Sequence, residues 1–276
     1  MEEYISNGRI ARALTIAGSD SGGGAGIQAD LKTFQELGAY GMSALTAITA
    51  QNTLGVQGVF PVAKEAVKAQ IHSVGSDIGV DALKTGMLFS AEIIEEVAEA
   101  IAFFGWSKVV VDPVMIAKGG AALLQVEAVR ALTRKLLPLT MIVTPNIPEA
   151  EHLTGMPIRN MADKLEAAKK LAGCGARYVL IKGGHEAGAE AVDLLYDGSG
   201  YMELTGKRIE TARTHGTGCT FSAALTAGLA QGLSVEEAVR QAKAYIQAAI
   251  EDGILIGSGH GPTNHWAYRN RQFVTN

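Results

Sequence analysis

The chain has 276 residues, 47% of them hydrophobic, and a formal net charge of −4. This composition supports a large core, and we expect one domain over residues 1–276, with residues 1–12 as a flexible extension. The acidic balance argues against a nucleic-acid partner. Neither a signal peptide nor a membrane-spanning run is visible in the sequence, so we expect no membrane partner and a cytoplasmic location.

Apolar runs typical of buried strands alternate with helical patterns along the first two thirds of the chain. The predicted strands cover residues 13–17, 43–50, 81–85, 108–112, 141–144 and 178–182. The predicted helices cover residues 26–37, 64–74, 91–104, a stretch ending at 137, and 161–172. Ser90 is a candidate N-cap for the third helix. Such alternation predicts an α/β fold with a mostly parallel sheet and helices on both faces.

The pattern changes beyond this point. Short strands over 192–196, 200–204 and 208–211, joined by tight turns, predict an antiparallel edge. Helices over 220–231 and 234–250 follow, and Ser234 with Glu237 matches a capping box. The sequence therefore predicts a three-layer α/β sandwich with a short antiparallel edge.

Polar and glycine residues recur directly after the predicted parallel strands. These positions include Gly18, Gln51, Met87, Asp112, Asn146 and Lys182. Because the carboxyl ends of parallel strands meet at one edge of the sheet, we expect these residues to lie close together where open α/β sheets bind ligands.

The segment from Gly24 to Ala29 fits the dinucleotide fingerprint G-x-G-x-x-G/A between a strand and a helix. An NAD-dependent oxidoreductase is therefore one hypothesis. The run from Ser43 to Ala50, however, has no acidic residue to hold a ribose, which weakens this interpretation. The alternative is a tight loop that brings a helix close to a strand. A P-loop motif is absent from the sequence.

A second glycine-rich stretch, from Arg213 to Ser222, leads into a run of small helical residues. Gly216 and Gly218 allow a tight loop, and the N-terminus of the following helix offers N–H groups and a positive dipole to an anion. We expect the same environment to favour the thiolate of Cys219. The other cysteine, Cys174, has no metal-ligand spacing to Cys219 and fits the end of a helix.

Three further strand-end residues complete a candidate phosphoryl-transfer site. Lys182 supplies a cation, and Asp112 and Glu149 are candidates to hold hydrated Mg²⁺. Each also has a purely structural interpretation: Asp112 could cap a loop, Glu149 could occupy the first turn of a helix, and Lys182 could be a surface cation.

Nearly the whole chain resembles the ribokinase-like superfamily, and within it the hydroxymethylpyrimidine (phosphomethylpyrimidine) kinases of thiamine biosynthesis. The resemblance lies in residues 13–20, 23–34, 84–88, 111–115, 144–150, 182–185, 215–220 and 261–265. It implies an ATP- and Mg²⁺-dependent kinase that phosphorylates the hydroxymethyl group of 4-amino-5-hydroxymethyl-2-methylpyrimidine and then the resulting monophosphate. Related enzymes are commonly homodimers.

The resemblance also implies a pyrimidine pocket, lined by Gly18, Asp30, Gln51, Met87 and Val114. An amide such as Gln51 can donate to and accept from an aminopyrimidine edge, and Met87 and Val114 offer apolar contacts to a flat ring. The structural alternative for Gln51 is a bond to its own loop. For Asp30 it is a solvated carboxylate on a helix face.

For catalysis, the resemblance implies that Cys219 accepts the proton of the substrate hydroxyl. The N–H groups of Gly216, Thr217, Gly218 and Cys219 would stabilise the transferred phosphoryl group. Lys182, Asn146 and Asp112 would contact ATP, and Glu149 with Asp112 would orient the metal or its waters. Most of the superfamily has Asp where this chain has Cys219.

Two rival functions remain open at this stage. Pyridoxal kinases of the same branch share the opening loop and the cysteine loop, but Gln51 and Thr217 favour the pyrimidine. A non-catalytic pyrimidine sensor is the second rival, and the presence of Cys219, Lys182 and Asp112 argues against it. The remaining histidines are scattered, so a metal hydrolase has little support.

Overall fold

The computed structural model describes residues 9–115, 126–184 and 188–274. Among them, an eight-stranded sheet has the order β10-β9-β8-β7-β6-β5-β1-β2. The neighbouring strands β2, β1, β5, β6, β7 and β8 are parallel to one another. The pairs β8–β9 and β9–β10 are antiparallel. The strands are β1 (Arg12–Ala17), β2 (Tyr40–Leu45), β5 (Ala82–Thr85), β6 (Val109–Val111), β7 (Ile142–Val143), β8 (Tyr178–Ile181), β9 (Glu190–Tyr196) and β10 (Tyr201–Lys207). The predicted parallel sheet with an antiparallel edge is confirmed.

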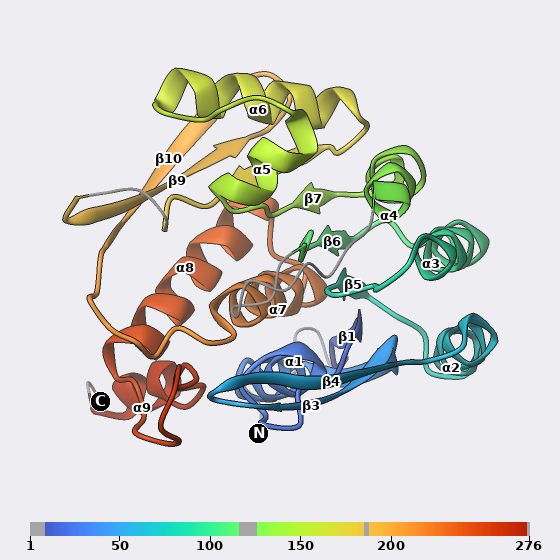
Figure 1. Ribbon diagram of the computed structural model, residues 1–276, viewed down its shortest axis with the longest axis horizontal. Helices are drawn as coiled ribbons and strands as arrows, with labels where there is room; N and C mark the ends of the chain where they lie inside the picture. Colours follow the sequence, from blue (N-terminus) through green and yellow to red (C-terminus); the bar gives the residue numbers. More distant parts are fainter. Residues whose placement is uncertain (1–8, 116–125, 185–187, 275–276) are drawn as a thin grey trace.

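Helices cover both faces of this sheet, as Figure 1 shows. One face carries α1 (Gly26–Glu36), α7 (Thr217–Ala230) and α8 (Val235–Glu251), against which α9 (Ala267–Val274) packs. The other carries α2 (Lys64–Asp77), α3 (Ala91–Phe104), α4 (Val126–Ala131), α5 (Ile147–Thr154) and α6 (Met161–Gly173). After α4 the chain continues through a wider helical turn, Leu132–Leu136, and a tighter one, Leu137–Leu139. The three layers predicted from the sequence are present.

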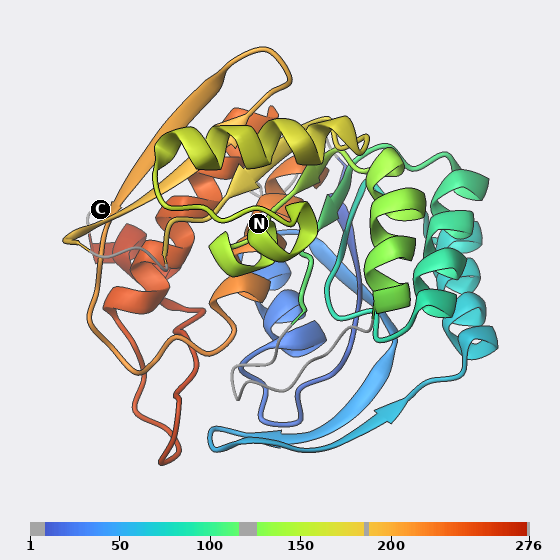
Figure 2. The ribbon, with the colours of Figure 1, turned by 45° about the horizontal axis from the view of Figure 1, so that its top comes forward.

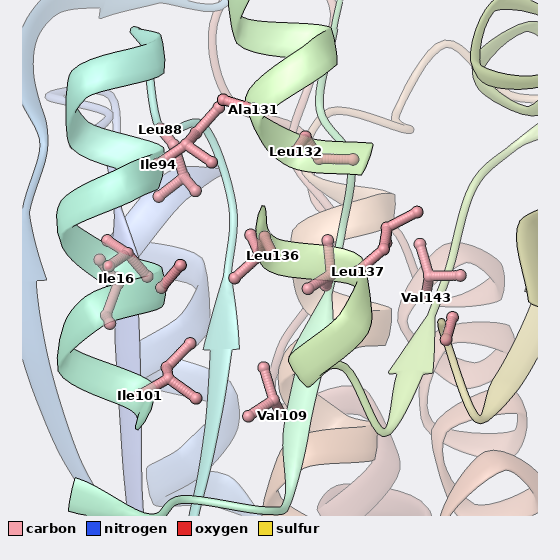
Figure 3. Packing of buried hydrophobic residues seen from close by; sticks show 14 of the residues in the cluster. Ile16, Leu88, Ile94, Ile101, Val109, Ala131, Leu132, Leu136, Leu137 and Val143 are labelled. Atoms are coloured by element: carbon pink, nitrogen blue, oxygen red, sulfur yellow. The ribbon is translucent and has the colours of Figure 1, made fainter. Parts of the chain in front are cut away.

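Figure 3 shows the core between the sheet and the α3 layer. Ile94 and Leu136 are fully buried and pack with Ile16, Val109 and Val143 from three strands. Burying one such side chain contributes about 1.5–3 kcal/mol. The apolar strand runs that identified the sheet in the sequence are thus covered on both faces.

Alternation along the strands sends other side chains to the opposite face. Leu14 and Ile16 join the cluster against α3, whereas Ala13 and Ala82 join the cluster under α1 and α7. Residues two positions along the strand from Ala13 and Ala82 share their face. Thr15 and Lys84 therefore point towards α1, which is where both side chains find a hydrogen-bond partner.

The strand predicted over residues 43–50 is wrong as a single element. β2 ends at Leu45, and after Thr46 the chain leaves the main sheet to form β3 (Ala47–Asn52). β3 pairs with β4 (Gly55–Pro61), which was not predicted, in a separate antiparallel ribbon (Figure 2). Gln70 holds the break, because its amide bonds both N–H and C=O of Leu45.

Other boundaries also differ from the prediction. Residues 208–210 are not a strand; Arg208 instead turns its guanidinium onto the carbonyl groups of Gly184 and Gly188. α5 was predicted only as one interpretation of Glu149, without bounds, and α7 begins three residues earlier than expected. The Ser90 cap and the capping box of Ser234 are confirmed.

At the N-terminus, residues 1–8 of the predicted extension lie outside the described residues. β1 begins within the remainder, at Arg12, and both Arg9 and Arg12 form ion pairs with Asp81. None of the helices in the described ranges has the length and apolar character needed to cross a membrane.

Candidate active site

Two glycine loops, one following β1 and one preceding α7, meet at the carboxyl edge of the sheet. Gly216 has a φ of +78° and is the N-cap of α7. A Cβ atom at this position would lie 1.8 Å from the carbonyl oxygen of Gly24. A side chain is therefore excluded both by backbone conformation and by space. The stretch around Gly216 and the opening glycine loop form one site, although nearly 200 residues separate them.

Asp20 organises the opening loop. Its Oδ1 accepts a hydrogen bond from the N–H of Gly22 at 2.8 Å, and its Oδ2 accepts from the N–H groups of Gly24 at 3.1 Å and Ala25 at 2.8 Å. The ring of His215 also lies 2.8 Å from Oδ2 through its Nε2. Burial by itself would raise the pKa of Asp20, but the bonds from His215 and the backbone hold it below its ordinary value.

Among the predicted pocket residues, Gly18 and Met87 are in direct contact. A Cβ atom at Gly18 would lie 2.3 Å from Cε of Met87, so any larger residue at position 18 would require the end of this methionine side chain to move. Gln51, near the end of β3, extends its amide to His215, with 3.3 Å between the two Nε2 atoms. Val114 is half-buried, and its N–H donates to the carbonyl of Asp112 at 2.8 Å. The structure thus brings Gly18 and Met87 together, with Gln51 on the adjoining ribbon.

Asp30 is fully buried, so its interpretation as a solvated helix-face carboxylate is wrong. Its Oδ1 accepts from Nζ of Lys84 at 3.0 Å, and its Oδ2 accepts from Oγ1 of Thr15 at 2.6 Å. Burial raises the pKa of Asp30, and the attraction of Lys84 opposes the rise. Both oxygens therefore have partners within the protein, and a direct contact of Asp30 with substrate stays a prediction.

Cys219 lies in the first turn of α7, beside the opening loop. Burial raises the pKa of its thiol to about 11, and the nearby Lys84 ammonium and a hydrogen bond from the Gly26 backbone only partly oppose the rise. The direction is opposite to the thiolate expected from the sequence, because removing the thiol from water disfavours its charged form. The Cys219 side chain is a protonated thiol at neutral pH.

Lys182 and Asp112 form an ion pair at the ends of β8 and β6, with 3.1 Å between Nζ and Oδ1. A Cβ atom at Gly218 would lie 3.4 Å from Oδ2 of Asp112 and 3.6 Å from Nζ of Lys182. The N-terminus of α7 therefore adjoins the cation. Burial lowers the pKa of Lys182, but Asp112 and Glu149 more than reverse this effect and raise it. The interpretation of Lys182 as a surface cation is wrong.

Asn146 and Glu149 form the capping box of α5. The Asn146 side chain accepts from the N–H of Glu149 at 2.9 Å, and Glu149 accepts from the N–H of Asn146 at 2.8 Å. Burial raises the pKa of Glu149 to about 7, with repulsion from Asp112 adding to the rise and Lys182 opposing it. Glu149 therefore occupies the first turn of a helix and also belongs to the charge cluster of Lys182.

Two carboxylates beside one ammonium provide oxygen ligands of the kind that Mg²⁺ accepts. Burial raises the pKa of Glu149, and repulsion from Asp112 adds to the rise, so this corner disfavours the ionised form of Glu149 although Lys182 is near. In the described ranges, no group of three or more His, Cys, Asp and Glu side chains could enclose a metal. The residues fit an ion held by one or two carboxylates and by substrate phosphates, and they do not fit a closed metal site.

The match to known proteins is extensive. The sequence model of the phosphomethylpyrimidine kinase family matches residues 20–264. The chain belongs to the phosphomethylpyrimidine kinase family. Family members of this kind are kinases, so the resemblance seen in the sequence motifs is confirmed, and the NAD-dependent oxidoreductase hypothesis is dropped.

Individual relatives in and around the phosphomethylpyrimidine kinase family cover the chain almost completely. A hydroxymethylpyrimidine/phosphomethylpyrimidine kinase of Bacillus subtilis is 55% identical over 96% of this chain and 98% of its own length. A pyridoxine kinase of the same organism is 49% identical over 95% of this chain and 98% of its own. The ADP complex of Bacillus subtilis pyridoxal kinase superposes with a TM-score of 0.88 at 47% identity, covering 95% of this chain and all of that one. The ribokinase-like fold is thereby confirmed.

Sequence reasoning missed three residues of this site: Asp20, Lys84 and His215. Lys84 had a detectable signal, because a lysine inside the apolar strand run 81–85 needs a buried partner. His215 and Asp20 lie in the quoted motifs, but their contact joins residues 195 positions apart. No local pattern predicts such a pair.

The raised pKa of the Cys219 thiol predicts slow alkylation near neutral pH. In a Cys174→Ser background, the rate of Cys219 modification by iodoacetamide should keep rising with pH towards about 11, because only the thiolate reacts. Mass spectrometry of the modified peptide after timed quenching measures this rate. A plateau already reached near pH 8 would contradict the effect assigned to burial.

The raised pKa of Glu149 predicts a pH-dependent stability. The folded protein holds this proton up to about pH 7 and the unfolded chain releases it near 4.5, so the stabilisation is complete below pH 4.5 and is lost as the pH rises through 7. Glu149→Gln keeps the oxygen that caps α5 and should increase the unfolding free energy by roughly 1–3 kcal/mol at pH 8, with little change at pH 4.5.

Urea unfolding at the two pH values measures the effect of Glu149→Gln. The exposed Glu166 on α6 provides the control, because Glu166→Gln should change stability equally little at both. A Glu149→Gln variant that behaves like the control would show that Glu149 is an ordinary solvated carboxylate.

Proposed function

We propose that this protein transfers the γ-phosphoryl group of ATP to 4-amino-5-hydroxymethyl-2-methylpyrimidine and then to the monophosphate, in thiamine biosynthesis. The observation that carries this proposal is the convergence at one sheet edge of the Gly18–Met87 contact, the Lys182–Asp112 pair and the N-terminus of α7. A flat acceptor bound at Gly18 and Met87 would present its alcohol to a phosphoryl group held by Lys182 and by the N-terminus of α7. The ribokinase-like relatives support ATP as donor, since one was solved with ADP.

The phosphate-binding part rests on electrostatics. Lys182 would neutralise the transferring phosphates, and the first turn of α7 would offer the N–H groups of Gly218 and Cys219. The N–H of Thr217 already donates to the carbonyl of Thr214 at 3.3 Å, so it contributes less than its neighbours. Gly216 contributes chiefly by its backbone conformation, which aims the helix at the site.

In this proposal Cys219 acts through its minor thiolate form: the thiol first releases its own proton to solvent, and the thiolate then accepts the hydroxyl proton late in the transfer. Phosphoryl transfer proceeds through a loose transition state, in which the attacking hydroxyl keeps its proton until its bond to phosphorus is well advanced. A thiol with a pKa of about 11 is almost never ionised at rest, so Cys219 would first act as a hydrogen-bond partner of the alcohol. Base catalysis then depends on the brief presence of the thiolate, which the nearby Lys84 stabilises.

Magnesium would be held by Asp112 and Glu149, directly or through water, together with the phosphates. Asn146 would orient Glu149 through the cap of α5. When bound, the ion supplies charge neutralisation between phosphate oxygens. Loading of Mg²⁺ would also displace the proton from Glu149, because a ligand carboxylate must be ionised.

A second candidate acceptor is pyridoxal or pyridoxine, because a pyridoxine kinase is 49% identical to this chain. Both acceptors are flat nitrogen heterocycles with a hydroxymethyl group. Gln51 favours the aminopyrimidine, since its amide can pair with the adjacent donor and acceptor of that ring.

Steady-state kinetics with both acceptors, followed by release of ADP, test the proposal. We expect kcat/KM for the pyrimidine to exceed that for pyridoxine or pyridoxal by at least tenfold. Cys219→Ala should lower kcat by about 10²–10³ with little change in the KM for ATP. Equal or greater kcat/KM for a vitamin B6 acceptor would overturn the assignment, and full activity of Cys219→Ser would remove the thiolate from the mechanism.

The ribbon of β3 and β4 supports a homodimer as the working state. Its outward face carries Ile48 and Phe60, which are paired across the strands and are 52% and 61% exposed. We propose that a second copy covers this face. Sedimentation velocity should find a dimer at micromolar concentration, and Ile48→Glu should shift it to monomer; a monomeric wild-type protein would contradict the proposal.

A further inference from the structure

His215 lies between two parts of the site without belonging to either of them in the proposed function. Its Nε2 atom is 2.8 Å from Oδ2 of Asp20 and 3.3 Å from Nε2 of Gln51. The Asp20 side chain is 2% exposed and that of His215 is 13% exposed. A partly buried cluster of a carboxylate, an imidazole and an amide therefore connects the opening loop to the predicted pyrimidine contact.

The proton on His215 is fixed by its partner. Asp20 has its pKa held below the ordinary value and is ionised, so its oxygens can only accept hydrogen bonds. Nε2 of His215 must therefore carry a hydrogen and donate it to Oδ2. The same nitrogen then has no free lone pair with which to accept from the NH₂ group of Gln51.

The environment of Thr49 sets the other end of the Gln51 amide. The hydroxyl of Thr49 donates to the carbonyl of Ser19 at 2.9 Å, and the same oxygen lies 3.2 Å from Oε1 of Gln51. A hydroxyl has a single hydrogen, so once it is given to Ser19 the oxygen can only accept. In this orientation Oε1 of Gln51, an acceptor, would face the Thr49 oxygen, which can also only accept. The NH₂ group of Gln51, a donor, would face the Nε2–H of His215, which also donates.

A half-turn of the amide removes both conflicts, because it exchanges the oxygen and nitrogen in place. The oxygen of Gln51 then accepts from the His215 N–H, which Asp20 shares, and the NH₂ group donates to Thr49. The backbone on both sides is fixed. Ser21 accepts the N–H of Gln51 and donates to its carbonyl, both at 2.8 Å, and the N–H of His215 donates to the carbonyl of Gly261 at 3.1 Å.

We infer that His215, held by Asp20, orients the Gln51 amide with its oxygen towards the imidazole and its NH₂ towards Thr49, and is thereby a positioning residue for acceptor selectivity. The selectivity part rests on the proposed function, in which Gln51 contacts the acceptor ring. The orientation itself concerns the protein alone and can be tested without any substrate.

The orientation of the Gln51 amide matters for selectivity. A half-turn of the amide exchanges the positions of the N–H donor and the oxygen acceptor that remain for the substrate ring. An aminopyrimidine presents a ring nitrogen that accepts and an amino group that donates. A pyridoxine edge with a phenolic hydroxyl does not require the same order. Loss of the His215 N–H frees the amide to rotate, which should weaken the pyrimidine more than the B6 acceptor, by about tenfold in their kcat/KM ratio.

The substrate-free test uses NMR of the wild-type protein labelled with ¹⁵N-histidine. Two-bond ¹H–¹⁵N correlations report which ring nitrogen carries the proton, and the His215 signals are those missing in His215→Phe. We expect Nε2 of His215 to be protonated between pH 6.5 and 8. An unprotonated Nε2 in this range would overturn the inference, whatever the enzyme phosphorylates.

The kinetic test compares three variants, each first shown by thermal unfolding to be folded. His215→Phe keeps a ring but removes the donor, and should lower the pyrimidine-to-pyridoxine ratio about tenfold through the KM for pyrimidine, with the KM for ATP unchanged. His215→Gln restores an N–H and should recover part of the ratio. His260→Phe removes an exposed histidine outside the cluster and should leave it unchanged.

The outcomes separate the two levels of the proposal. If the wild-type enzyme does not phosphorylate the pyrimidine, the proposed function fails. The NMR test of the proton on Nε2 of His215 still tests the orientation of the Gln51 amide in that case. If the wild-type enzyme prefers the pyrimidine and His215→Phe keeps its ratio, the role of His215 in selectivity is wrong. An equal loss with both acceptors would also overturn it, because that result indicates a purely structural role.

Discussion

The contact between Gly24 and Gly216 is the constraint on which the rest of the site depends. A Cβ atom at Gly216 would lie 1.8 Å from the Gly24 carbonyl, so the two loops approach as closely as their backbones permit. This approach places the N-terminus of α7 beside the loop that follows β1. Asp20 and His215 then connect the same two loops through side chains. Without glycine at position 216, the two glycine loops could not approach this closely.

Charge in this site is kept in ion pairs, one fully buried (Lys84 with Asp30) and one partly buried (Lys182 with Asp112). In each pair one ammonium lies about 3 Å from one carboxylate. Lys182 and Asp112 lie at the ends of β8 and β6, and Lys84 and Asp30 lie between the sheet and α1. A buried pair such as Lys84 with Asp30 is costly to break, because removing one partner leaves an uncompensated charge. Glu149 is the exception, because burial and repulsion from Asp112 raise its pKa to about 7 despite the nearby Lys182. It is therefore the group most suited to respond to an incoming cation.

The same balance between burial and charge decides the state of Cys219. Lys84 and the Gly26 N–H favour the thiolate, but burial favours the thiol more strongly, so the pKa rises to about 11. A motif that suggests an activated cysteine thus contains a protonated one. The proximity of Lys84 nevertheless means that a thiolate formed during the reaction would have a cation close by. Cys219 therefore rests as a thiol, whereas base catalysis would need its thiolate.

The sequence by itself determined the strand and helix alternation, the capping residues Ser90 and Ser234, the glycine loops and the family. These features are local, because periodicity and caps depend on residues a few positions apart. Only the tertiary structure decided that the chain leaves the sheet after Leu45, that Cys219 keeps its proton and that His215 meets Asp20. Each of these depends on burial or on contacts between segments far apart in the chain, and the energy of a buried charge or hydrogen bond is set by the groups that surround it rather than by its sequence neighbours.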